Sequence, residues 1–108
     1  MALSNVIKTD EANFDKLIDN TNKAVLVDFY ADWCGPCKTL TPILDQLSKY
    51  YTKAVIVKVN VDENQNLAAR FAIRSIPTLI VFKNRKQLET LMGVHTASQL
   101  EQKLKAYE

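Results

Sequence analysis

The sequence lacks several features that would place it in a specialised class of protein. Its 108 residues contain no apolar run near the roughly 20 residues that span a membrane, and no basic segment followed by an apolar core opens the chain. We therefore expect a cytoplasmic protein without membrane association. The net charge of +2 is too small to indicate a nucleic-acid partner or an acidic membrane surface. No linker, repeat or low-complexity segment is present, which predicts a single domain over residues 1–108.

The sequence contains few cysteine and histidine side chains, and the two cysteines belong to a single motif. Only two cysteines and one histidine occur, and both cysteines lie in the segment Trp33-Cys34-Gly35-Pro36-Cys37-Lys38. Structural zinc prefers four ligands, so two cysteines and the distant His95 predict no metal site within one chain. We interpret His95 as a solvated turn residue. In a reducing compartment a close cysteine pair is more often catalytic or metal-binding than structural.

The surroundings of the cysteine pair favour reversible thiol chemistry. An apolar run over residues 24–30 precedes the pair and is typical of a buried strand, and a helical pattern follows it. Residues three apart share a helix face with Cβ atoms roughly 5–6 Å apart. Their Cα separation then falls within the roughly 4.4–6.8 Å that a disulfide tolerates, so the pair can open and close with little backbone movement. A purely structural bridge is the alternative, but so small a loop would contribute only about 2 kcal/mol.

Hydrophobic periodicity predicts an alternation of strands and helices. The expected strands cover residues 6–8, 24–30, 54–59, 78–82 and about 88–92, and the expected helices lie near residues 14–18, 34–51, 62–71 and 96–107. This order requires right-handed crossovers between parallel strands, followed by an antiparallel hairpin. We therefore expect an α/β fold: a central mixed sheet, with a parallel βαβ half and an antiparallel ββα half, flanked by helices on both faces. The cysteines would lie at a carboxyl end of that sheet.

Four polar or proline positions give local expectations for the helices. Pro36 falls in the first turn of its helix, where a missing N–H costs nothing. Pro42 lies inside the same helix and is expected to kink it. Asp62 is expected to cap the following helix. Thr96, with Gln99 three residues later, has the pattern of a capping box for the last helix.

The motifs together resemble the thioredoxin family, and the resemblance runs from end to end of the chain. The matching segments are Val27-Asp28-Phe29, Ala31-Asp32-Trp33-Cys34-Gly35-Pro36-Cys37-Lys38, Pro42-Ile43-Leu44, Lys58-Val59-Asn60-Val61-Asp62 and Ile73-Arg74-Ser75-Ile76-Pro77-Thr78. The resemblance implies the thioredoxin fold and a general protein-disulfide reductase, a thiol–disulfide oxidoreductase with disulfide-containing proteins as substrates. It also implies that no cofactor is bound, because reducing equivalents come from NADPH through a flavoprotein thioredoxin reductase.

Three polar residues are expected to carry the chemistry. Cys34 would be the nucleophile, because a helix N-terminus favours the thiolate, and Cys37 would then attack Cys34 to release the reduced partner. A carboxylate at Asp28, inside an apolar strand, would have its pKa raised by desolvation. The resemblance implies that Asp28 helps to deprotonate Cys37 through water. The alternative is a strand-end residue that points to solvent. Lys58 is the expected electrostatic partner of Asp28, although a lysine at a strand edge is common.

A substrate-binding surface is expected around the cysteines. An Ile76–Pro77 bond is predicted trans from the sequence alone, whereas the resemblance implies a cis bond that presents the Ile76 backbone beside Cys34 to an extended substrate segment. The expected apolar docking surface consists of Trp33, Gly35, Pro36, Ile76, Met92 and Gly93, with Ser75 beside it. A core position is the alternative for Trp33. The pair Gly35-Pro36 between the cysteines helps to tune the redox potential and resembles the reductase form.

Four positions depart from the common family pattern. Tyr30 stands where many members have Trp, and Ala72 and Ser75 stand where many have Gly. Arg85 follows Asn84 in place of the usual Asn-Gly turn. Since a left-handed conformation at Arg85 would cost roughly 1–2 kcal/mol, we expect a longer turn or one of another type.

A second class of function is compatible with the same fold. The chain could serve as a binding or holdase module whose redox activity is incidental. Survival of full function after replacement of both cysteines would distinguish that class from a reductase. In either case we expect a monomer.

Overall fold

A computed structural model describes residues 4–108 of the chain. The elements in chain order are β1 (Ile7–Lys8), α1 (Phe14–Asp19), β2 (Ala24–Tyr30), α2 (Gly35–Tyr50), β3 (Ala54–Asn60), α3 (Gln65–Arg70), β4 (Thr78–Lys83), β5 (Lys86–Met92) and α4 (Ala97–Lys105). The predicted order of strands and helices is confirmed. The last strand begins at Lys86, ahead of the expected position near Leu88.

The strands form one mixed five-stranded sheet in the order β1-β3-β2-β4-β5. β1 and β2 both pair with β3 in parallel, whereas β4 pairs antiparallel with β2 and with β5. The predicted α/β architecture, with a parallel half and an antiparallel half, is therefore confirmed. β2 lies at the centre, which explains why residues 24–29 are all buried.

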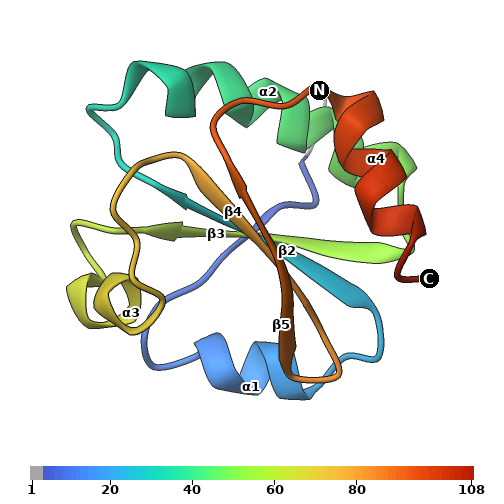
Figure 1. Ribbon diagram of the computed structural model, residues 1–108, viewed down its shortest axis with the longest axis horizontal. Helices are drawn as coiled ribbons and strands as arrows, with labels where there is room; N and C mark the ends of the chain where they lie inside the picture. Colours follow the sequence, from blue (N-terminus) through green and yellow to red (C-terminus); the bar gives the residue numbers. More distant parts are fainter. Residues whose placement is uncertain (1–3) are drawn as a thin grey trace.

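Helices cover both faces of the sheet, α2 and α4 on one side and α1 and α3 on the other (Figure 1). Side chains alternate along β2, so that Leu26 packs under α2 and α4 while Val27 and Phe29 pack against α1 and α3. The core between the sheet and the helices α2 and α4 is completed by leucines of these helices, Leu40, Leu44, Leu47, Leu100 and Leu104. Because Asp28 follows Leu26 by two residues, its side chain belongs to the same face as α2.

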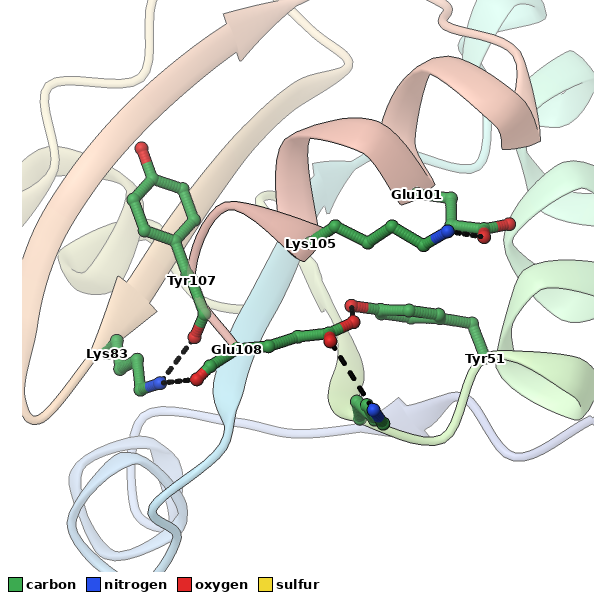
Figure 2. Close-up of polar contacts among 7 residues, drawn as sticks. Tyr51, Lys83, Glu101, Lys105, Tyr107 and Glu108 are labelled. Atoms are coloured by element: carbon green, nitrogen blue, oxygen red, sulfur yellow. Dashed lines mark hydrogen bonds and ion pairs between the residues drawn. The ribbon is translucent and has the colours of Figure 1, made fainter.

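The end of the chain is fixed to the sheet by polar contacts (Figure 2). The Tyr51 hydroxyl, just after α2, donates a hydrogen bond of 2.5 Å to Glu108 Oε2. Lys53 Nζ lies 3.5 Å from Glu108 Oε1. Lys83 at the end of β4 donates to the main-chain oxygens of Tyr107 and Glu108. These contacts tie the segment after α4 to both α2 and β4.

Of the two N-caps predicted for α4 and α3, one is confirmed and the other is wrong. Thr96 and Gln99 form the expected capping box, with hydrogen bonds in both directions. The expectation that Asp62 caps α3 is wrong, because α3 begins later and has Asn64 at its N-cap without a side-chain cap. Instead, Glu11 Oε1 accepts the N–H groups of Asn66 and Leu67 from across the molecule. A carboxylate distant in sequence thus does the work of a local cap.

Between residues 4 and 108, three residues other than glycine adopt left-handed backbone conformations. Asn84 and Arg85 have φ of 53° and 68°, so the β4–β5 turn is a two-residue turn of the type whose twist suits a hairpin. The expectation of a longer turn or another type is therefore wrong, because strand twist outweighs the local cost at Arg85. Ala72 has φ of 53°, which explains why a glycine would suit that position.

Two further findings complete the description of the helices. α2 continues through Pro42, and the kink expected there stays a prediction. No helix among residues 4–108 is both long and apolar enough to cross a membrane.

Candidate active site

The corner between β2 and α2 presents Cys34 at the start of the helix. Cys34 is the N-cap residue, and its Sγ accepts the N–H of Cys37 at 3.2 Å. The Cys34 N–H donates to the Ala31 carbonyl, and the Cys34 carbonyl accepts the N–H of Lys38, both at 3.2 Å. With Gly35 and Pro36 completing the first turn, the backbone around the sulfur is fixed by local hydrogen bonds. The Sγ atom of Cys34 therefore faces the positive end of α2.

The two cysteines are joined by a disulfide. Their Cα atoms are 5.2 Å apart, within the range expected for residues three apart at the start of a helix. Cys34 is 5% exposed and Cys37 is 2% exposed. Both cysteines are thus buried, and Cys37, one turn into the helix, is slightly less exposed than Cys34.

The segment before β4 lies beside the first cysteine. The Ile76–Pro77 peptide bond is cis, which agrees with the family resemblance rather than with the expectation from sequence alone. The Ile76 carbonyl oxygen lies 3.8 Å from Cys34 Sγ. Gly93, in a left-handed conformation with φ of 83°, donates its N–H to the Pro77 carbonyl at 2.9 Å. This bond joins the end of β5 to the same edge of the site.

Exposed apolar side chains occur in two of the segments at the site. Trp33 is 69% exposed and Met92 is 67% exposed, so the alternative core position for Trp33 is wrong. The Trp33 Nε1–H donates to Asp62 Oδ2 at 2.8 Å, which fixes the position of the indole. Beside the indole lies a pocket of about 180 Å³, lined by Trp33, Val61, Ala68, Ile73, Arg74, Ser75 and Ile76.

The remaining expected surface residues differ in exposure. Gly35, Pro36 and Ser75 are exposed, whereas Ile76 and Gly93 are half-buried. All the residues expected to form the docking surface belong to the three segments described here, residues 33–36, 75–77 and 92–93. His95, expected as a solvated residue, is half-buried, with Nδ1 3.2 Å from the Gly93 carbonyl oxygen.

Asp28 lies in the interior, on the face of the sheet that α2 covers. It is 2% exposed, and its Oδ1 has no hydrogen-bond partner among residues 4–108. Burial raises the pKa of Asp28 to about 7, and the opposing charge of Lys58 reduces the rise. Lys58 is the direct partner of Asp28 in the β2–β3 register. The alternative of a strand-end carboxylate in solvent is therefore wrong.

A pocket that is open to solvent lies beside the start of α2. The pocket has a volume of about 300 Å³ and is lined by Lys8, Tyr30, Ala31, Asp32, Cys37, Lys38, Thr41 and Lys58. Cys37 and Lys58 thus line the same solvent-accessible pocket. Such an arrangement allows water to connect buried proton donors and acceptors near Cys37.

Some residues at the site escaped the sequence analysis. Asp62 is the hydrogen-bond partner of Trp33 rather than a helix cap. Lys8 lies opposite Lys58 in the β1–β3 register and forms an ion pair of 3.2 Å with Glu63. The parallel register that brings Lys8, Lys58 and Asp28 into one row could have been found by aligning the three strands, since each carries its charge near the carboxyl end.

A cysteine pair that opens a helix, with a cis-proline loop and an apolar rim beside it, can exchange a disulfide with a partner protein. No cluster of three or more His, Cys, Asp or Glu in the described part of the chain could hold a metal ion. The fold and the site define a thiol–disulfide oxidoreductase.

Comparisons with known proteins identify the family. Residues 5–106 match the sequence model of the family described as Thioredoxin. The chain is 40% identical over 103 residues to a thioredoxin from Porphyra purpurea, with 94% of this chain and 96% of the relative covered. It is 45% identical over 91 residues to a thioredoxin from Rickettsia felis, covering 83% and 87%. A solved mutant thioredoxin from Halobacterium salinarum superposes with a TM-score of 0.88 at 34% identity, covering 99% and 96%.

The chain belongs to the thioredoxin family. Members of this family are thiol–disulfide oxidoreductases and work without a bound cofactor. In general their partners are disulfide-containing proteins and thioredoxin reductase.

Proposed function

We propose that this protein is a general protein-disulfide reductase in which Cys34 attacks the substrate and Cys37 resolves the intermediate. The single observation that carries this proposal is the position of Cys34 Sγ, which caps α2 and accepts the Cys37 N–H at 3.2 Å. The same N–H and the helix dipole favour negative charge on that sulfur once the disulfide is reduced.

The first step forms a mixed disulfide. The Cys34 thiolate attacks one sulfur of a partner disulfide, the partner S–S bond breaks, and a new bond joins Cys34 to the partner. The other partner sulfur leaves as a thiolate and takes a proton from solvent. The Ile76 carbonyl, 3.8 Å from Cys34 Sγ, marks the edge along which an extended partner segment would align.

The second step regenerates the observed disulfide. Asp28 accepts the Cys37 proton through water, and the Cys37 thiolate attacks Cys34. The bond between Cys34 and the partner breaks, and the released partner thiolate takes a proton from solvent, so the partner leaves as a dithiol with two electrons more than before. A carboxyl group with a pKa of about 7 is suited to this transfer near neutral pH. Lys58 tunes that carboxyl group, and Gly35 with Pro36 tunes the potential of the disulfide.

Substrate docking uses the apolar rim around the disulfide. Trp33 and Met92 contribute most of the exposed apolar surface, while Ile76 contributes the backbone edge. Gly35, Pro36, Ser75 and Gly93 complete this surface, and the buried Pro77 fixes the backbone that presents Ile76.

The cellular setting completes the proposal. Electrons come from NADPH through a flavoprotein thioredoxin reductase, and the protein acts in the cytoplasm in electron transport and redox homeostasis. Residues 1–108 form a single domain that functions as a monomer.

The proposal is tested by insulin-disulfide reduction, with dithiothreitol or thioredoxin reductase and NADPH as the electron source. We expect catalytic precipitation of the insulin B chain by the unmodified protein and none by the Cys34→Ser variant. Cys37→Ser should accumulate a mixed disulfide with substrate, because nothing resolves it, whereas Cys34→Ser should not.

The double variant Cys34→Ser/Cys37→Ser is the matched control for thiol-independent effects. A mixed disulfide trapped in Cys34→Ser but not in Cys37→Ser would reverse the two roles. Full function of the double variant in the cell would instead support a binding module.

A further inference from the structure

Three charged residues form one row across the parallel half of the sheet. Lys8 in β1 lies opposite Lys58 in β3, and Lys58 lies opposite Asp28 in β2. Direct partners on parallel strands place their side chains on the same face, so all three belong to the face that α2 covers. Tyr30 follows Asp28 by two residues and therefore shares this face at the end of β2.

The Lys58 ammonium lies over the ring of Tyr30, 5.3 Å from the ring centroid. A cation at this distance is attracted by the negative face of an aromatic ring. The ammonium has no carboxylate within ion-pair distance among residues 4–108, whereas the neighbouring Lys8 pairs with Glu63 at 3.2 Å. The ring of Tyr30 is thus the contact that fixes where the Lys58 charge lies.

We propose that Tyr30 is a positioning residue, whose ring holds the Lys58 ammonium at the mouth of the pocket beside Cys37 and so controls how readily Asp28 gains a proton. The inference rests on the proposed role of Asp28 in the second step of the reaction. Many members of the family have Trp at the position of Tyr30. The inference gives this position a role, because a tyrosine ring, like an indole, offers a face to a cation.

The physical reason is the distance dependence of the interaction between Lys58 and Asp28. The attraction between the ammonium and the carboxylate weakens as their separation grows and as water fills the gap. A Lys58 side chain released from the ring would extend into the pocket, which is open to solvent and has a volume of about 300 Å³. Asp28 would then lose part of the attraction that opposes the effect of burial.

Other charged groups face the same region and must stay constant in a test. They are Lys8 from β1, Asp32 after β2, Lys38 from α2 and Glu63 after β3, with Tyr30 itself on β2 and Cys37 on α2. β4 contributes Leu79, which is apolar, opposite Asp28. Keeping the protein in its disulfide form removes Cys37 from the titration, so that the Asp28 carboxyl can be followed by itself.

The test follows the carboxyl carbon of Asp28 by NMR between pH 4 and pH 10 in the disulfide form. Tyr30→Leu should raise the titration midpoint by roughly 0.5 pH unit, and Lys58→Met should raise it at least as much. In the double variant Tyr30→Leu/Lys58→Met, the midpoint should equal that of Lys58→Met alone. Tyr30→Phe is the conservative control and should keep the midpoint, because the ring remains.

Two results would overturn the inference. The first is that folded Tyr30→Leu keeps the Asp28 titration midpoint of the unmodified protein. The second is that Tyr30→Leu still shifts the midpoint when Lys58 is already replaced by Met, which would indicate that Tyr30 acts directly on the burial of Asp28. The unmodified protein gives a further check, since the ε-methylene protons of Lys58 should show an upfield ring-current shift, and its absence would also refute the contact. These readouts do not depend on insulin reduction, so a failure here is distinguishable from a failure of the proposed function.

Discussion

Asp28 is expected to destabilise the fold increasingly as the pH rises from about 4 to 7, and replacement by Asn should reveal by how much. Burial raises the pKa of Asp28 from its ordinary value of 3.8 to about 7, a rise of about three units. Since each unit corresponds to about 1.4 kcal/mol, ionising this carboxyl group in the folded protein costs about 4 kcal/mol.

The sign of the pH dependence follows from proton binding in the two states. Below about pH 4 the carboxyl group is protonated in both the folded and the unfolded chain, so no cost arises. Between pH 4 and pH 7 the unfolded chain releases the proton while the folded chain keeps it, so the free energy of unfolding falls as pH rises. Above pH 7 both states are ionised and the full cost is present.

The assay is denaturant unfolding of the disulfide form from pH 4 to pH 9, followed by circular dichroism. Asp28→Asn should match the unmodified protein to within a constant offset at pH 4 and gain on it by up to about 4 kcal/mol by pH 8, because Asn does not titrate. The matched control is Asp19→Asn, the same change at an exposed position in α1, on the opposite side of the sheet from α2. Parallel pH profiles for Asp28→Asn and the unmodified protein would refute the assignment of a buried, destabilising carboxyl group.

Three substitutions test how the backbone and the helix ends are stabilised. Ala72→Gly should raise the free energy of unfolding by about 1 kcal/mol, because φ is 53° at this position. The control Ala69→Gly, inside α3, should lower the free energy of unfolding by about as much. If denaturant titrations gave the same effect for both variants, the argument would be contradicted. Thr96→Ala should cost about 1 kcal/mol through loss of the capping box, with Ser98→Ala as the control in the same helix. Glu11→Ala should cost about 1 kcal/mol and speed amide exchange at the start of α3; unchanged exchange there would show that the long-range cap is dispensable.

Much of the fold follows from local patterns in the sequence. The apolar run that becomes β2 and the three- and four-residue spacing of leucines in α2 each determine one element directly. The capping box at Thr96 is equally local. The cysteine pair could be assigned a role for the same reason, since three-residue spacing at a helix start fixes the sulfur geometry by itself.

The features that could not be predicted depend on contacts between distant segments. The cap of α3 comes from Glu11, far away in sequence, and so the local candidate Asp62 was wrong. Asp62 instead bonds Trp33, which no periodic pattern could indicate. The left-handed conformation at Arg85 follows from the twist of β4 and β5, which outweighs the preference of one residue.

The central claim is that the start of α2 makes Cys34 the more acidic and more reactive thiol while Cys37 stays protected beneath it. The most direct measurement is the pH dependence of iodoacetamide alkylation of the reduced protein, with each cysteine followed separately by mass spectrometry. The account predicts that Cys34 reacts first, with a midpoint clearly below the roughly 8.5 of a free cysteine. Alkylation of Cys34 with the midpoint and rate of a free cysteine, or faster modification of Cys37, would contradict it.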